Sequence, residues 1–129
     1  NTYTLTDFKE KTIFLNFWSM KCNICKEELE SIEKLYQEYQ NKDIIILTII
    51  SPKESNATKE EIKTYIEDHN YTFPVLIDEE STIFNNYHIT SYPNSFIIKD
   101  QEIKQKIPGA LPYDQLNLLY HIPQNKKFL

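Results

Sequence analysis

The chain has 129 residues, a length that suits one domain with a hydrophobic core of its own. Of these residues 40% are hydrophobic and 26% are charged, so the composition is that of a folded protein rather than a disordered one. The net charge of −5 and the lack of a clustered basic stripe argue against nucleic acid as a partner, and no apolar run approaches the ~18 residues that a membrane span requires.

The first half of the chain predicts a β-α-β unit. Residues 12–18 are almost continuously apolar and rich in β-formers, which is typical of a strand buried on both faces, and residues 43–50 repeat this pattern. Between them, residues 24–40 place apolar side chains at helical spacing: Leu29, Ile32, Leu35, Tyr36 and Tyr39. A strand, a helix and a strand in this order form parallel sheet. Residues 2–8 are expected to add a small edge strand.

The second half of the chain predicts shorter elements. Ser51 and Pro52 end the second strand, and Thr58 with Glu61 forms a capping box that opens a helix. After it we expect a strand over 73–77, a short helix over 80–87, paired strands over 95–99 and 103–107 around a turn at 100–101, and a last helix from about Pro112. Together these elements predict an α/β fold with a central mixed sheet and helices on both faces.

The two cysteines, Cys22 and Cys25, lie where the first strand ends and the first helix begins. Unpaired N–H groups and the helix dipole favour an anion at a helix N-terminus, so the thiolate of Cys22 is expected to be stabilised there. The neighbouring Lys21 adds positive charge. The thiolate is the reactive form of cysteine, and the pattern therefore predicts a redox pair in which Cys22 attacks a disulfide and Cys25 resolves the mixed disulfide.

Three alternatives to a redox pair fit these cysteines less well. A structural zinc site needs two more ligands, and the histidines are scattered without ligand-like pairing, so no metal site is predicted. Two inert core cysteines fit poorly with the polar Lys21 and Asn23 beside them. A purely structural disulfide would close a very small loop and contribute little stability.

Three segments together resemble the TlpA/ResA-like extracytoplasmic thioredoxins. They are the active-site segment 16–29, the segment 92–98, which is similar to that family's cis-proline loop and following strand, and Gly109-Ala110-Leu111 before the final helix. The resemblance covers nearly the whole chain. It implies a thioredoxin fold, with a thioredoxin-like domain over 1–122 and a tail or the start of a linker over 123–129.

One branch of this family is the most similar to the chain. The thioredoxin-like N-terminal domain of fused methionine sulfoxide reductases shares three patterns, which here are Ser51-Pro52, Phe73-Pro74-Val75 and Ile89 to Pro93. In that branch the domain delivers electrons to the reductase domains that follow it. The resemblance therefore implies a methionine sulfoxide reductase domain as a partner.

The resemblance also implies roles for individual residues. Cys22 corresponds to the nucleophile, Cys25 to the resolving cysteine and Pro93 to a cis-proline that faces them. Together with Tyr92, Pro93 is expected to form one wall of the substrate groove, although a proline at a strand start is also an ordinary structural feature. Glu28 corresponds to an acidic residue that tunes the cysteines, and it is also an ordinary glutamate of a first helical turn.

Two more residues, Trp18 and Lys21, are candidates for substrate binding. Trp18 corresponds to the aromatic residue four before the nucleophile, with a core tryptophan as the alternative. Lys21 stands where the family usually has tryptophan, which places the substrate contact of that ring in question. Asn16 replaces the buried aspartate of cytoplasmic thioredoxins, so Glu28 or water is expected to accept the proton of Cys25.

The function predicted from these features is that of an enzyme, a thiol-disulfide oxidoreductase that reduces disulfides of a partner protein. It is expected to use no cofactor beyond the Cys22–Cys25 disulfide, to act outside the cytoplasm as a monomer and to receive electrons from a membrane donor. The reductive direction comes from the resemblance, since an oxidising protein uses the same motif. The alternative is a non-enzymatic thioredoxin-fold metal carrier or adaptor that uses the two cysteines as ligands.

Overall fold

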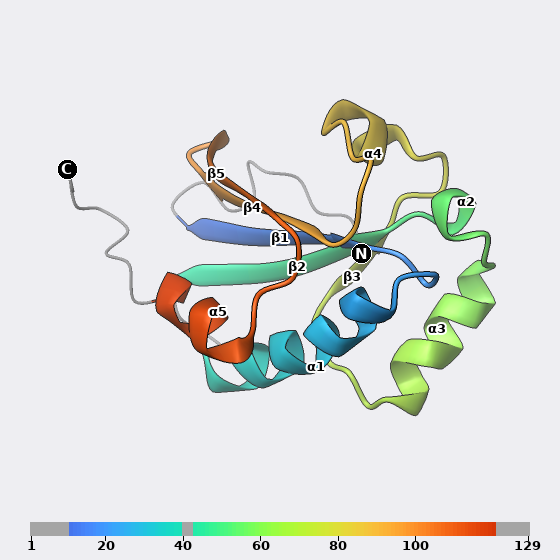
Figure 1. The fold of residues 1–129 in the computed structure, drawn as a ribbon, viewed down its shortest axis with the longest axis horizontal. Helices are drawn as coiled ribbons and strands as arrows, with labels where there is room; N and C mark the ends of the chain where they lie inside the picture. The colour runs from blue at the N-terminus through green and yellow to red at the C-terminus, as the bar shows by residue number, and fades with distance from the viewer. Residues whose placement is uncertain (1–10, 40–42, 121–129) are drawn as a thin grey trace.

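The sheet of this protein has five strands and mixed direction. The computed structural model describes residues 11–39 and 43–120, and its strands follow the order β3-β2-β1-β4-β5 across the sheet (Figure 1). The strands are β1 Thr12–Trp18, β2 Ile44–Ile50, β3 Val75–Ile77, β4 Asn94–Lys99 and β5 Glu102–Pro108. β1, β2 and β3 are parallel, whereas β4 pairs antiparallel with both β1 and β5. β1 therefore lies in the middle of the sheet, paired on both sides.

Helices cover both faces of this sheet, as the sequence predicts for an α/β fold. They are α1 Asn23–Glu38, α2 Pro52–Ser55, α3 Lys59–Asp68, α4 Thr82–Asn86 and α5 Tyr113–Tyr120. Figure 1 shows α1, α3 and α5 on one face of the sheet and α4 on the other. The short α2 lies between the end of β2 and the start of α3.

Most predicted elements are confirmed, with small shifts at their ends. The strand over 12–18 has the expected bounds, and the capping box of α3 forms, with Thr58 and Glu61 each bonding the backbone of the other. The main difference is α2, because Ser51 and Pro52 do more than end a strand. Ser51 is the N-cap of α2 and Pro52 its first residue, a position that proline favours. The expected strand over 2–8 lies outside the described residues.

The turn between β4 and β5 forms without glycine. Asp100 and Gln101 connect the two strands and have left-handed φ angles of 54° and 65°. A two-residue hairpin loop with both residues in this region matches the right-handed twist of the strands. The expected turn at these two residues is therefore confirmed.

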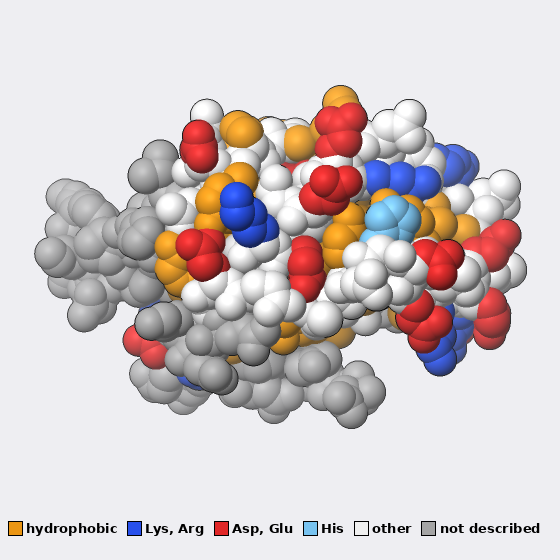
Figure 2. All heavy atoms as spheres, turned by 90° about the horizontal axis from the view of Figure 1, so that it is seen from below, with side chains coloured by type: hydrophobic (Ala, Val, Ile, Leu, Met, Phe, Trp, Pro, Cys, Tyr) orange, Lys and Arg blue, Asp and Glu red, His pale blue; other side chains and the backbone are white. Residues whose placement is uncertain are grey.

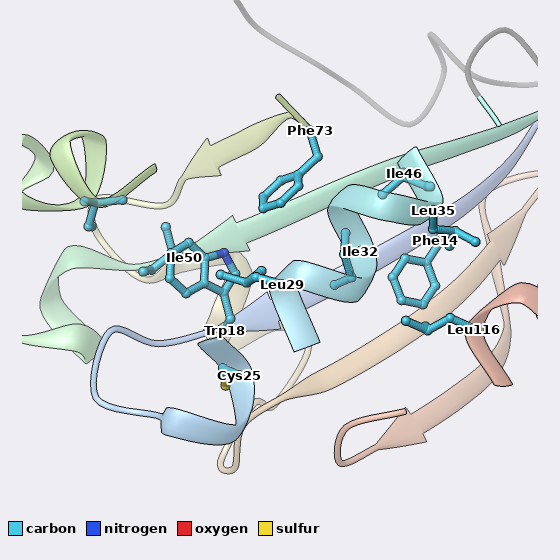
Figure 3. Packing of buried hydrophobic residues seen from close by; sticks show 11 residues of the cluster. Phe14, Trp18, Cys25, Leu29, Ile32, Leu35, Ile46, Ile50, Phe73 and Leu116 are labelled. Atoms are coloured by element: carbon cyan, nitrogen blue, oxygen red, sulfur yellow. The ribbon is translucent and has the colours of Figure 1, made fainter. Parts of the chain in front are cut away.

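The core consists of two layers, one on each face of the sheet. The cysteine-side cluster lies under α1, α3 and α5 and is drawn in Figure 3: Phe14, Trp18, Cys25, Leu29, Ile32, Leu35, Ile46, Ile50, Ile62, Phe73 and Leu116. The α4-side cluster lies on the opposite face: Ile13, Leu15, Phe17, Leu47, Ile49, Phe84, Phe96 and Ile98. Successive residues of β1 alternate between the two faces, which explains why this strand is apolar along most of its length.

A row of three polar residues interrupts the apolar pattern on the cysteine side. Asn16 of β1 pairs in register with Thr48 of β2 and with Ser95 of β4, and all three residues are buried. By the two-residue alternation of a strand, Asn16 shares its face with Phe14 and Trp18 of the cysteine-side cluster. We call these three residues the polar row.

The surface over α1, α3 and α5 is rich in acidic side chains. Figure 2 shows them spread across this face and interspersed with basic ones, in line with the net charge of −5. Within residues 11–39 and 43–120, no helix is long and apolar enough to cross a membrane.

Candidate active site

The two cysteines lie at the N-terminus of α1. Cys22 is the N-cap residue and has extended backbone angles, so the helix begins directly after it. The two residues form a disulfide with a Cα–Cα distance of 5.2 Å. The Cys22 Sγ also accepts a hydrogen bond of 3.1 Å from the backbone N–H of Cys25, one of the N–H groups that a helix start leaves without an intrahelical partner. The same N–H can stabilise a thiolate on Cys22 when the disulfide is reduced.

The two sulfur atoms differ in their access to solvent. Cys25 is fully buried in the cysteine-side cluster, and Figure 3 shows it beside Trp18 at the start of α1. Cys22 is only partly buried. An incoming partner can therefore reach Cys22, whereas Cys25 is placed to react with the Cys22 sulfur once that sulfur is bound to the partner.

A second loop lies at the same edge of the sheet as the cysteines. Phe17 near the end of β1 pairs with Asn94 at the start of β4, so the residues just before Asn94 lie beside the loop that leads to Cys22. The Tyr92–Pro93 peptide bond is cis, as expected. The carbonyl of Pro93 accepts a hydrogen bond of 2.9 Å from the N–H of Gly109, which follows β5.

Glu28 is buried one helical turn after Cys25, with only 4% of its surface exposed. Its Oε1 accepts a hydrogen bond of 3.0 Å from the Asn16 side-chain amide, and its Oε2 accepts one of 2.8 Å from the backbone N–H of Leu111. Asn16 also donates to Ser95 Oγ at 2.9 Å. Asn16 stands where cytoplasmic thioredoxins have a buried aspartate. It therefore binds Glu28, the residue that is expected to accept the proton in place of that aspartate.

The pKa of Glu28 reflects two opposing effects. Burial raises the pKa above its ordinary value and is the larger effect, while the hydrogen bonds from Leu111 and Asn16 lower it. The net direction is upward, so the carboxyl group retains its proton to a higher pH than an exposed glutamate. A carboxyl group with a raised pKa, one helical turn from Cys25, is chemically able to exchange a proton.

The other two candidates differ in their exposure. Trp18 is fully buried in the cysteine-side cluster, with its ring 6.1 Å from that of Tyr65. This position favours the alternative of a core tryptophan and argues against direct contact with a substrate. Lys21 has an exposed side chain next to Cys22, and its backbone N–H donates to Ser19 Oγ at 3.2 Å. Its contact with a substrate stays a prediction.

Sequence reasoning missed three residues around the cysteines: Ser19, Glu54 and Ser55. Two of them belong to α2, and the hydroxyl groups of Ser19 and Ser55 lie 3.3 Å apart. The signal in the sequence is the Ser-Pro pair at 51–52, since serine is a common N-cap and proline a common first helical residue. That pair predicts a helix start, but it does not predict which loops the helix contacts.

No cluster suited to a metal ion is found in the part of the chain that the structure describes. No three His, Cys, Asp or Glu side chains are grouped there as a metal site would require. The expectation of a site without metal stays a prediction.

Comparison with known proteins places this geometry in a family. Residues 1–106 match the model of the AhpC/TSA family. The thiol-disulfide oxidoreductase ResA of Bacillus thuringiensis subsp. konkukian is 34% identical over 113 residues, which are 87% of this chain and 63% of that protein. The chain thus spans less than two thirds of the length of this curated relative.

Solved structures show the same fold. The exposed lipoprotein thioredoxin Etrx1 of Streptococcus pneumoniae superposes with a TM-score of 0.82 at 28% identity, covering 95% of this chain and 93% of that one. StoA of Bacillus subtilis gives a TM-score of 0.80 at 24% identity, covering 87% and 84%. Since the AhpC/TSA model covers most of the sequence, the chain belongs to the AhpC/TSA family, and it is similar to ResA-type thiol-disulfide oxidoreductases.

Proposed function

We propose that this chain is a thiol-disulfide oxidoreductase that reduces disulfides of a partner protein through Cys22 and Cys25. The observation that carries the proposal is the placement of the pair. Cys22 is accessible at the start of α1, and Cys25 is buried one turn inside the same helix. The similarity to ResA, a named thiol-disulfide oxidoreductase, supports the same activity.

The reaction is a two-electron exchange in two steps. The Cys22 thiolate attacks one sulfur of the partner disulfide, forms a mixed disulfide and releases the first partner thiolate, which takes up a proton. The Cys25 thiol gives up its proton, its thiolate attacks the Cys22 sulfur, and the second partner thiolate leaves and takes up a proton. The products are a reduced partner and the Cys22–Cys25 disulfide, the oxidised form seen in this structure. A membrane electron donor is the proposed source of the electrons that restore the dithiol.

Glu28 is proposed to accept the proton of Cys25 in the second step. It lies one helical turn after Cys25, both residues are buried in α1, and its pKa is raised by burial. Because a protonated thiol is a poor nucleophile, a buried Cys25 needs a nearby group that takes its proton. Proton transfer between Cys25 and Glu28 fits this need directly or through one water molecule.

The proposal also includes a partner, a location and an oligomeric state. A methionine sulfoxide reductase domain is the proposed partner, on the patterns that the sequence shares with domains fused to such reductases. The proposed location is extracytoplasmic, and the similarity to a pneumococcal protein described as an exposed lipoprotein supports it. The proposed oligomeric state is a monomer.

Reduction of insulin disulfides by dithiothreitol tests the proposed activity. We expect the protein to accelerate the reaction and the Cys22→Ser variant to add nothing to the rate of dithiothreitol alone. Mass spectrometry should show that reduction adds two hydrogen atoms to the chain. A protein that gives no acceleration, or that purifies with stoichiometric metal on its cysteines, contradicts the proposal and favours a metal carrier.

The partner needs a separate assay with an oxidised methionine sulfoxide reductase. We expect the reduced protein to reduce the disulfide of that enzyme. Reduction of insulin without reduction of the reductase rejects this partner and leaves the activity in place.

A further inference from the structure

The short helix α2 lies between the two loops that flank the cysteine pair. Ser51 caps it by accepting a hydrogen bond of 3.2 Å from the N–H of Glu54, and Pro52 occupies its first position. The helix ends at Ser55, and its C-cap Asn56, with a left-handed φ of 52°, turns the chain toward α3. A capped turn of four residues with a fixed start and end holds its side chains in defined directions.

One side of α2 holds the loop that leads to Cys22. The buried Ser55 accepts a hydrogen bond of 3.1 Å from the N–H of Met20, and its hydroxyl donates to Ser19 Oγ at 3.3 Å. Ser19 in turn accepts from the N–H of Lys21 at 3.2 Å and, through its carbonyl, from the N–H of Cys22 at 3.2 Å. Every residue from Ser19 to Cys22 is therefore tied to Ser55 directly or through one intermediate.

The neighbouring residue of α2 holds the second loop. Glu54 is exposed, and its carboxylate lies close enough to the hydroxyl of Tyr92, the residue before Pro93, to act on it through its negative charge and as a hydrogen-bond acceptor. The Tyr92 ring also lies 6.0 Å from the ring of Phe84. Burial, the negative charge of Glu54 and this hydrogen bond raise the pKa of Tyr92, so its hydroxyl keeps the proton that it donates.

We infer that α2 is a brace that fixes the distance between the two loops, with Ser55 and Glu54 as positioning residues for the docking of a protein disulfide. The inference rests on the proposed function. Ser55 and Glu54 are consecutive, so a movement of one loop is transmitted to the other through a single turn of helix. A folded partner must fit both loops at once, whereas a small disulfide needs only the sulfur of Cys22.

Steady-state kinetics with two substrates test this inference. The substrates are insulin and a small aromatic disulfide, 5,5′-dithiobis(2-nitrobenzoic acid). We expect Ser55→Ala to raise the KM for insulin about two- to twelvefold, because the net contribution of a hydrogen bond is about 0.5–1.5 kcal/mol. The kcat for insulin and the rate with the small disulfide should stay within about twofold.

Because Glu54 is exposed, we expect its variants to fold, so they test the inference separately from any effect on stability. Glu54→Ala should raise the KM for insulin by a smaller factor than Ser55→Ala, and Glu54→Gln should restore it because the amide oxygen still accepts from Tyr92. Adding Tyr92→Phe to Glu54→Ala should cause less further loss than Tyr92→Phe causes alone. Lys53→Ala is the matched control on the same helix, since the Lys53 side chain forms an exposed ion pair of 3.6 Å with Glu80, which contributes little.

Two results would overturn the brace. One is an unchanged KM for insulin in both Ser55→Ala and Glu54→Ala. The other is an equal loss with insulin and with the small disulfide, which would mean that α2 acts on the reactivity of Cys22 and not on docking. A wild-type protein that reduces neither substrate would instead reject the proposed function, so the two failures are distinguishable.

Discussion

The two faces of the sheet differ in what they bury. On the α4 side, the central strands present apolar residues, such as Leu15 of β1 and Leu47 of β2. On the cysteine side, the same strands bury Asn16 and Thr48 at one level, and α1 places the carboxyl group of Glu28 against this level. Burying polar groups is costly unless they are hydrogen-bonded. In the centre of the sheet, the costly burial of polar groups thus occurs on the face that carries the cysteines.

The α4 side therefore contributes mainly to stability, whereas the cysteine side also contributes to the chemistry. The α4 side is packed by aromatic pairs, among them Phe17 and Phe84 with ring centroids 5.0 Å apart. The cysteine side is packed as well, but it also buries polar groups, among them Glu28 one helical turn from Cys25. Variants on the two faces should therefore change different measurements.

The largest effect is expected at the cysteines. Cys25→Ser should accumulate a mixed disulfide with a partner protein, because the second step has lost its nucleophile. Cys22→Ser should accumulate none, because its remaining cysteine is fully buried. Non-reducing gel electrophoresis after mixing with an oxidised partner measures both. Equal trapping by the two variants would contradict the assignment of Cys22 as the nucleophile.

The next effect is expected on the α4 side. Phe84→Ala should lower the free energy of unfolding by about 3–5 kcal/mol, because it removes a buried aromatic ring and leaves a cavity. The pH dependence of disulfide exchange by the folded fraction should match that of the wild type. Urea unfolding and stopped-flow exchange at several pH values measure the two quantities. A shifted pH profile would show that the faces are not separable.

Glu28→Gln should change the chemistry more than the stability. We expect the second step to slow by about 10²-fold, a typical contribution of general-base catalysis. The variant should also lose the part of the pH–rate profile that Glu28 contributes. Stopped-flow reduction between about pH 5 and 9 decides the matter, and an unchanged profile would mean that the glutamate takes no part in proton transfer.

The same substitution has an effect on stability whose sign follows from the pKa. Because folding raises the pKa of Glu28, the folded state binds the proton more tightly than the unfolded state. The contribution of this group to stability is therefore largest below its unfolded pKa and declines as the pH rises through its folded pKa. Glu28→Gln should flatten that decline in urea unfolding curves measured across this range, relative to the wild type.

The smallest effect is expected at the N-cap of α3, which packs on the cysteine side but lies outside the polar row. Thr58→Ala should cost about 1 kcal/mol of stability, because Thr58 Oγ1 accepts a hydrogen bond of 3.0 Å from the N–H of Glu61. Disulfide exchange should be unchanged. Thermal unfolding measures the stability, and the insulin assay measures disulfide exchange. A loss of exchange in fully folded protein would show that α3 also contributes to the chemistry.

Local patterns allow much of the fold to be predicted. The apolar run over 12–18, the capping box at Thr58 and the turn at 100–101 each depend on neighbours in sequence, and each is confirmed. The position of the cysteines at a helix start follows from the same local signals. By contrast, α2 has only four residues, too few to show a helical period.

The surroundings of Glu28 are beyond prediction for a different reason. Its partners Asn16 and Leu111 lie 12 and 83 residues away in sequence, so their contacts depend on the register of the strands and on the path after β5. In the sequence, Asn16 is notable because it stands where cytoplasmic thioredoxins have an aspartate. Only the structure shows that its side-chain amide binds Glu28. The burial of Trp18 likewise depends on how α3 packs over the end of β1.

Because of the polar row, the surroundings of the cysteines form completely only when the strands of the sheet are correctly aligned. Asn16, Thr48 and Ser95 come from three strands, and they share a level only when β1, β2 and β4 are all in register. A slip of one residue in β1 would turn Asn16 to the other face of the sheet and place an apolar side chain before Glu28. A misaligned chain would keep both cysteines, but it would lose the carboxyl environment beside them. The cysteine motif is thus present from synthesis onward, whereas the carboxyl group proposed to accept the Cys25 proton gains its partner Asn16 only in the finished sheet.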